Sequence, residues 1–119
     1  MSIIYKEKIV FAGAVGFLNG LLPVNLSDSK VFLPESIEEQ ARKIMRNFDE
    51  ILAQHALSRE HLIAVQIFLK DFHRFHARLD VISEELFGAS SNVSKSVVGV
   101  QALTRDALVS MNFIIRTDK

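Results

Sequence analysis

The sequence contains no cysteine, and this absence excludes two kinds of small protein. Without thiols the chain can form neither a disulfide framework nor a thiolate metal site. An excess of positive charge is also missing, because 14 Lys and Arg balance 14 Asp and Glu and the net charge at pH 7 is zero. Sequence-independent nucleic-acid binders carry a basic surface, so we expect no nucleic acid as a partner.

Long uninterrupted apolar segments are missing as well. The first eight residues lack the apolar core of a signal peptide. The longest apolar stretch, residues 9–22, is broken by three glycines and one asparagine and is too short and too rich in glycine for a membrane span. The sequence therefore predicts a soluble, cytoplasmic protein without a membrane partner, and the lack of cysteine fits a reducing compartment.

What the chain does have is enough apolar residues, 49% of 119, for the core of one domain covering 1–119. A box of the form S-x-x-E, Ser36 with Glu39, predicts the start of a helix that runs to about residue 55. Asp71 is predicted to cap a second helix that ends at Gly88. Period-two patterns predict strands, at 3–5, 9–15, 62–70, 94–101 and 108–116, of which the last two form a closing hairpin.

The resulting order, ββαβαββ, predicts an α+β domain with a two-layer mixed β-sheet and two helices on one face. The strands at 62–69 and 108–115 are apolar on both faces at several positions. Two helices can cover only one face of such a sheet, and an uncovered apolar face normally marks an interface. We therefore expect the second face to be buried against other copies of the chain.

Three segments resemble the Rid/YjgF family, also called reactive intermediate deaminases or the L-PSP endoribonuclease-like family. They are I-E-E-Q-A-R at 37–42, V-Q-I-F-L-K-D-F at 65–72 with L-F-G at 86–88, and S-V-V-G-V-Q-A-L at 96–103. The resemblance covers about residues 9 to 116, in order. It implies a YjgF-like (chorismate mutase-like) fold, assembled as a homotrimer with ligand clefts between subunits.

The resemblance also implies where a ligand binds and where this chain departs from the pattern. Family deaminases hold the substrate carboxylate with an arginine, which matches Lys95 here, and use a glutamate that matches Asn112. Lysine offers a point contact instead of a planar fork, and asparagine cannot take a proton. The family's S-G-Q segment is matched by Ala12 and Gly13, and Phe87 stands at the helix end.

We predict these five residues, Lys95, Asn112, Gly13, Ala12 and Phe87, as ligand-binding positions. If 101 pairs with 106 in the predicted hairpin, Lys95 lies opposite Asn112 on the same face. The alternatives are a solvated lysine and an asparagine satisfied within the core. His73 and His76 are three apart on a helix, but no third ligand follows at a characteristic spacing, so we expect no metal and no cofactor.

Two functions of different classes remain open at this point, and a third is disfavoured. The first is binding of a small carboxylate-bearing metabolite, a keto, imino or enamine acid, with weak or absent 2-iminobutanoate/2-iminopropanoate deaminase-like hydrolase activity. The alternative is a non-catalytic regulatory or protein-interaction trimer. A ribonuclease or translation inhibitor, which the family's older name implies, is disfavoured by the neutral charge and the lack of a general acid–base pair.

Overall fold

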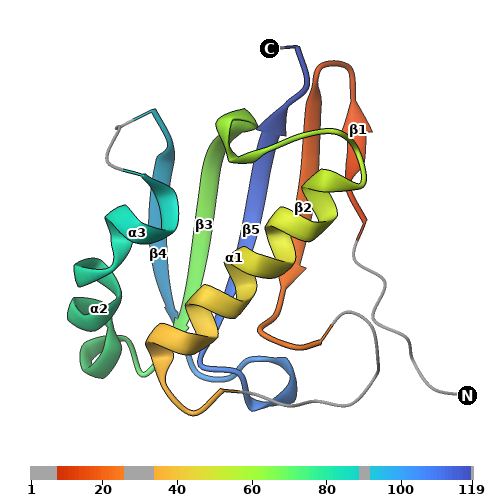
Figure 1. Cartoon of the computed structure of the whole chain (residues 1–119). Helices are drawn as coiled ribbons and strands as arrows, with labels where there is room; N and C mark the ends of the chain where they lie inside the picture. Colours follow the sequence, from red (N-terminus) through yellow and green to blue (C-terminus); the bar gives the residue numbers. More distant parts are fainter. Residues whose placement is uncertain (1–7, 26–33, 89–91, 119) are drawn as a thin grey trace, which may run out of the picture.

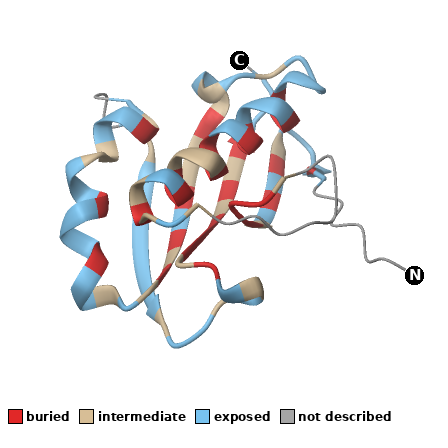
Figure 2. Ribbon diagram, turned by 60° about the horizontal axis from the view of Figure 1, so that its bottom comes forward, coloured by how far each residue is buried: buried red, intermediate tan, exposed pale blue. Residues whose placement is uncertain are grey.

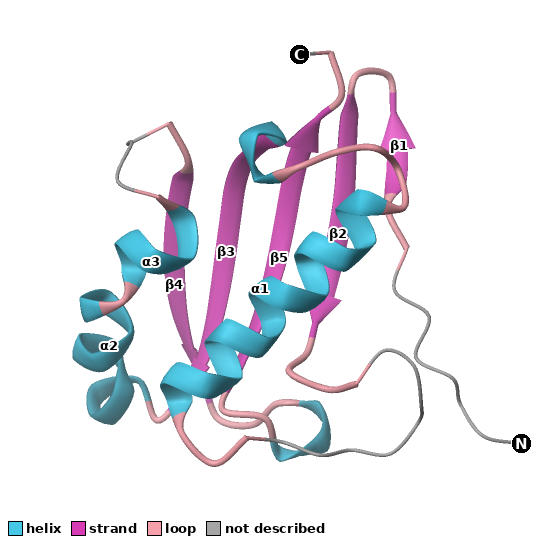
Figure 3. Ribbon diagram, viewed as in Figure 1, coloured by secondary structure: helices cyan, strands magenta, loops and turns pink. Residues whose placement is uncertain are grey.

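Five strands form one sheet in the computed structural model, which describes residues 8–25, 34–88 and 92–118. Their spatial order is β1-β2-β5-β3-β4 (Figures 1 and 3). The bounds of the strands are Val10–Ala12 (β1), Val15–Leu21 (β2), Leu62–Lys70 (β3), Ser94–Val100 (β4) and Val109–Arg116 (β5). All neighbours are antiparallel except β3 and β4, which are parallel, so the sheet is mixed as the sequence predicted.

The helices lie on one side of this sheet (Figure 1). Helix α1 (Ile37–Ala53) crosses β2 and β5, while α2 (Phe72–Val81) packs on β3 and β4 and is followed by α3 (Ser83–Phe87). Two short 3-10 turns, η1 (Arg59–His61) and η2 (Thr104–Asp106), lie in connections. The two-layer α+β class predicted from the sequence is confirmed.

The start of α1 follows from its local sequence. The Ser36 hydroxyl accepts a hydrogen bond from the backbone N–H of Glu39 at 3.1 Å, which satisfies one of the free donors at the helix start. The prediction that the Asp71 side chain caps the second helix is wrong. Asp71 precedes α2, but its backbone is left-handed (φ 51°) and its side chain makes no capping hydrogen bond.

The predicted single helix from 71 to 88 is also wrong. The chain leaves helical geometry at Ile82 (φ −99°, ψ 8°), and this residue separates α2 from α3. Gly88 ends α3 as expected, with a φ of +86° that glycine adopts without steric cost. Phe75, Leu79 and Leu86 are all buried, and they keep helical spacing on the two sides of the break. The apolar pattern of the sequence therefore resembles that of one continuous helix.

The N-terminal strands differ from the prediction in the same way. The predicted strand at 9–15 is divided by a two-residue turn at Gly13 and Ala14, and Gly13 has the positive φ (61°) that such tight hairpins require. The second arm, β2, extends to Leu21, into a stretch expected to be irregular. The predicted strand at 3–5 lies outside the described residues.

The predicted closing hairpin does not form. Strand β3 lies between β4 and β5 and pairs with both, so β4 and β5 are not neighbours. Helices α2 and α3 carry the chain from β3 to its parallel neighbour β4, as a crossover between parallel strands requires. Residues 101–108 then pass the end of β3, a span of about 10 Å at the usual strand spacing, before β5 begins.

Burial alternates along β3 and β5 (Figure 2), and the strand register assigns most of the buried residues to the face that the helices cover. On the covered face, the core side chains of β2, β3 and β5 that pack under the helices are at most 4% exposed: Leu18, Val65, Ile67, Leu69, Val109, Met111, Phe113 and Ile115. The open face carries the alternate residues, among them Phe17, Asn19, Gln66, Phe68, Ser96, Val98, Asn112 and Ile114. In the described part of the chain, no helix has both the length and the apolar character needed to cross a membrane.

Candidate functional site

A small cleft lies where α2 and α3 overhang the edge strand β4. We call it the edge cleft; its volume is about 200 Å³, and its lining residues are Ile67, His76, Leu79, Asp80, Ser83, Phe87, Lys95 and Val97. The sheet supplies its floor and the two short helices supply its wall. The cleft therefore depends on the crossover from β3 to β4, which places a helix face above the edge of the sheet.

Lys95 reaches this cleft because of the parallel register of β4. It pairs with Val65, a buried residue of the covered face, so its side chain lies on the helix side of the sheet. Further along β4, Gly99 allows Phe72 to pack closely, since a Cβ atom on Gly99 would lie 3.0 Å from Phe72 Cβ. Helix α2 therefore contacts β4 at its start and leaves the space beside Lys95 open.

Two residues predicted from the sequence meet in the edge cleft. The Lys95 ammonium lies 5.7 Å from the centroid of the Phe87 ring, within the range of a cation–π contact. Both side chains retain access to solvent. A ligand anion that approaches Lys95 would thus meet a charge placed against an aromatic wall.

Three polar lining residues were not predicted as ligand-binding positions from the sequence, although His76 was considered as a metal ligand. His76, Asp80 and Ser83 come from α2 and the start of α3, at spacings of four and three residues that put them on one side. Their spacing was available, but each is a common surface residue type, and nothing in the sequence shows which face of α2 turns toward β4. The ring of His76 stacks on Phe72, with centroids 4.8 Å apart and an interplanar angle of 11°.

Asn112 does not share a face with Lys95, and the predicted pairing of these two residues is wrong. Asn112 pairs with Gln66, whereas Lys95 pairs with Val65, so the two side chains lie on opposite faces of the sheet. The reason is the intervening strand β3, which the predicted hairpin left out. Asn112 Oδ1 accepts a hydrogen bond of 2.7 Å from the backbone N–H of Gly20, where the pairing of β2 with β5 shifts register.

Asn112 belongs to a second depression, on the open face. We call it the neutral cleft; it has a volume of about 390 Å³ and is lined by Phe17, Asn19, Ala64, Val65, Gln66, Ser94, Ser96, Asn112 and Ile114. Its polar groups are amides and hydroxyls, with no charged side chain in the lining. These groups can donate and accept hydrogen bonds, but they cannot serve as a general base at neutral pH.

Ala12 and Gly13 lie far from the other predicted positions. They belong to the turn between β1 and β2, at one edge of the sheet, while Lys95 is on β4 at the opposite edge. Within one chain the sheet order keeps these groups apart. Of the five predicted ligand-binding residues, the structure brings together Lys95 and Phe87 only.

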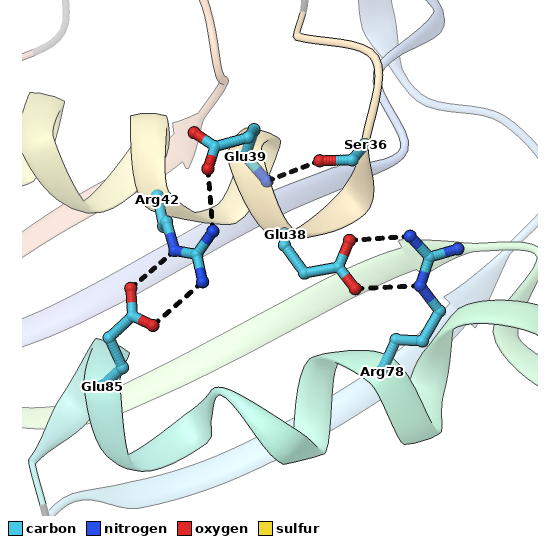
Figure 4. A network of polar contacts seen from close by, with 6 residues as sticks. All are labelled: Ser36, Glu38, Glu39, Arg42, Arg78 and Glu85. Atoms are coloured by element: carbon cyan, nitrogen blue, oxygen red, sulfur yellow. Dashed lines mark hydrogen bonds and ion pairs between the residues drawn. The ribbon is translucent and has the colours of Figure 1, made fainter.

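Charged residues behind the edge cleft hold its helical wall in place (Figure 4). Arg42 on α1 donates two hydrogen bonds to Glu85 on α3, at 2.6 and 3.0 Å, and Arg78 on α2 donates two to Glu38 on α1, at 2.9 and 2.7 Å. The hydrogen bonds from Arg78 lower the pKa of the Glu38 carboxyl, and those from Arg42 lower the pKa of Glu85. Both pairs are forked, the geometry that arginine and carboxylate favour.

No group of three His, Asp or Glu side chains within residues 8–25, 34–88 and 92–118 is placed to hold a metal ion. The two histidines considered as ligands, His73 and His76, instead both contact the ring of Phe72, with centroids at 5.7 and 4.8 Å. The edge cleft therefore offers a cation, a carboxylate and apolar surface as its means of recognition.

These features define a two-layer α+β domain with an uncovered sheet face and a charged cleft at one sheet edge. A family model described as Endoribonuclease L-PSP matches residues 3–116. The chain belongs to this family, which is the Rid/YjgF family that the sequence motifs resembled.

Individual proteins show the same relationship. A RutC family protein of Aquifex aeolicus is 28% identical over 110 residues, which cover 92% of this chain and 86% of that protein. A 2-iminobutanoate/2-iminopropanoate deaminase of Dermatophagoides farinae is 26% identical and covers 92% of this chain and 83% of its own length.

Solved structures share the fold at lower identity. The Rid protein YyfA of Yersinia pestis superposes with a TM-score of 0.82 at 22% identity, covering 96% of this chain and 89% of that one. Escherichia coli TdcF with bound serine superposes with a TM-score of 0.78 at 22% identity, covering 92% and 85%.

Proposed function

We propose that the protein is a cytoplasmic homotrimer that binds a small carboxylate-bearing metabolite, a keto, imino or enamine acid, in a cleft between subunits. We further propose that its imine deaminase activity is weak or absent. The observation that carries the proposal is the position of Lys95, which lines the edge cleft and forms no ion pair with any residue in the described part of the chain.

The trimer is supported by the open face. Phe17 and Val98 are each 38% exposed there, and Val10 of the neighbouring β1 is 56% exposed. Apolar side chains that face water at several places on one sheet face favour burial against another copy. A second copy is also the only source from which Ala12 and Gly13 could join Lys95, because one chain holds them at opposite sheet edges.

Binding without efficient catalysis is supported by the residue types. Lys95 provides a point charge where the family's deaminases use the planar fork of an arginine, so a carboxylate is held with less directional control. Asn112 cannot accept a proton, and it lies on the sheet face opposite Lys95. Two similar proteins fit a site for small carboxylates: one is named a 2-iminobutanoate/2-iminopropanoate deaminase, and the other, Escherichia coli TdcF, has a solved structure with bound serine.

The test is a titration of the full-length protein with pyruvate, followed by the amide chemical shifts of residues around β4 and α3. We expect Lys95→Met to weaken binding roughly 5- to 10-fold, as expected for the loss of one solvent-exposed charge-assisted contact. Lys95→Arg should bind at least as tightly as the natural protein. Lys43→Met, which removes a charge from α1 outside the edge cleft, serves as the control and should change nothing.

Catalysis is measured separately, as ammonia release from freshly generated 2-aminoacrylate. We expect a rate close to that of buffer. Pyruvate binding that is unchanged in Lys95→Met would contradict the assignment of the site. If neither pyruvate nor another small acid binds, the non-catalytic regulatory or protein-interaction trimer becomes the better hypothesis.

A further inference from the structure

We propose that Asp80 makes the edge cleft selective for ligands that carry a protonated nitrogen beside the carboxylate, as in the iminium form of an imino acid or in a zwitterionic α-amino acid, over keto and hydroxy acids. This inference rests on the proposed carboxylate site at Lys95. It adds a second recognition group that the sequence analysis did not identify.

The cleft carries one charge of each sign on different elements. Lys95 is the second residue of β4, and Asp80 lies in the last turn of α2. Both line the same 200 Å³ cleft, yet they form no ion pair with each other within a 4 Å limit. A ligand that carries both a carboxylate and an ammonium group can therefore turn each toward the side chain of opposite charge in the same cleft.

Asp80 differs from Glu38 and Glu85, two acidic residues of the same helical layer. Glu38 and Glu85 are each held by a forked arginine contact, from Arg78 and Arg42 respectively. Asp80 has no such partner among the residues that the structure describes. Its carboxylate is thus available to the cleft, where it attracts an ammonium group and repels a second carboxylate.

His76 does not take over this role. It lies one turn before Asp80, and one face of its ring is occupied by the stacked ring of Phe72. The remaining lining beside the two charges is mainly apolar, from Ile67, Leu79, Phe87 and Val97. This surface fits a short aliphatic side chain better than a polar one.

The volume of the cleft fits a small amino acid. Its volume of about 200 Å³ lies below the roughly 300–1,000 Å³ of pockets that hold drug-sized ligands, so it favours a ligand with few non-hydrogen atoms. An amino acid with a one- to three-atom side chain is such a ligand. Because the cleft is open to solvent, its charges are screened, and we expect a preference of roughly 5- to 10-fold instead of absolute selectivity.

The experiment compares two probes of nearly the same shape, L-alanine and L-lactate, which differ in an ammonium against a hydroxyl group. Both are titrated into the full-length protein at low ionic strength, with dissociation constants measured by calorimetry or amide shifts. The natural protein should bind alanine roughly 5- to 10-fold more tightly than lactate. In 1 M salt this ratio should shrink, because the screening length falls to about 3 Å.

The decisive variant is Asp80→Asn, which keeps the shape and removes the charge. This variant should bind alanine more weakly than the natural protein does and bind lactate equally or more tightly, so that the ratio of the two affinities approaches one. Damage to the fold would instead weaken the binding of both probes together. Glu84→Gln removes one negative charge from α3 outside the cleft lining and should leave the ratio unchanged.

The outcomes separate the inference from the proposed function. If Lys95→Met weakens both probes while Asp80→Asn changes them equally or not at all, the carboxylate site stands and the amine selectivity is wrong. A natural protein that binds lactate more tightly than alanine would also contradict the amine selectivity, without any variant. If Lys95→Met leaves both probes unchanged, or neither probe binds the natural protein, both proposals are wrong.

Discussion

The covered face and the open face of the sheet use the same strands and differ in almost every other respect. On the covered face the rings of Phe48 and Phe113 stack with centroids 3.9 Å apart, and both are fully buried. Asn112 precedes Phe113 on β5 and faces the open side. Its Oδ1 accepts a hydrogen bond from the N–H of Gly20, where the pairing of β2 with β5 shifts register. Phe17, its neighbour in the neutral cleft, remains 38% exposed.

This contrast separates the part of the chain that stabilises the fold from the surface that remains exposed. The helices complete the covered face, so the stability of a single chain resides there. The open face combines exposed apolar side chains with a group of amides and hydroxyls, which suits a surface that meets another copy in one register. The edge cleft lies on the helix side of the sheet, at the edge strand β4, which is exposed along most of its length.

The largest expected difference lies between two phenylalanines. Phe113→Ala should lower the free energy of unfolding by about 3–5 kcal/mol, because it removes a fully buried ring and leaves a cavity. Phe17→Ala should cost the dissociated chain less than about 1 kcal/mol, since its ring is already partly in water. Urea unfolding at low protein concentration measures both. Equal losses would mean that the two faces contribute alike to the single chain.

The asparagines of the two regions give a smaller contrast. Asn47 on α1 is buried and donates to the carbonyl oxygens of Leu22 and Val24, at 3.1 and 2.7 Å. Asn47→Ala leaves both carbonyls without this donor and should cost about 1–3 kcal/mol. Asn112→Ala removes one hydrogen bond from a half-buried site and should cost about 0.5–1.5 kcal/mol. The same urea measurement ranks them, and a reversed order would contradict the assignment.

The smallest effect is expected from the ion pairs between the helices, and it depends on pH. The pKa values of Glu38 and Glu85 are lowered in the folded chain, chiefly by hydrogen bonds from Arg78 and Arg42. Their contribution is therefore present above the ordinary glutamate pKa of 4.5 and is lost as the pH falls through the lowered values.

Melting temperatures measured from pH 7 to pH 3 test this linkage. Glu85→Gln should melt slightly below the natural protein at pH 7, and the two curves should converge in acid. Because the pair is exposed, the difference is expected to be small. Glu84→Gln, one residue away and outside the ion pairs, should follow the natural protein at every pH. A difference for Glu85→Gln that grows in acid would contradict the assignment.

Local signals in the sequence predicted local structure well. The Ser36 cap and the apolar spacing predicted α1, and the dense apolar run predicted the bounds of β3. The break at Ile82 was not visible, because buried residues on both sides keep helical spacing. The turn at Gly13 was not predicted for a related reason, since apolar residues continue on both sides of it.

Pairing between strands could not be predicted from the same signals. Two strands adjacent in sequence favour a hairpin by default, and nothing local shows that β3 inserts between β4 and β5. That single error placed Lys95 and Asn112 on one face. The resemblance to a family marked these two positions, but the faces they occupy depend on register, which a shift of one residue inverts. Asp80 remained unnoticed because its significance comes only from its position across from β4.

Sedimentation equilibrium of the natural protein at micromolar concentration tests most directly whether other copies cover the open face. We predict a mass three times the 13.4 kDa of the chain, because the exposed apolar side chains of that face favour burial in a symmetric assembly. A stable, folded species with the mass of one chain would contradict this prediction, and would leave the edge cleft of the single chain without any contribution from a second subunit.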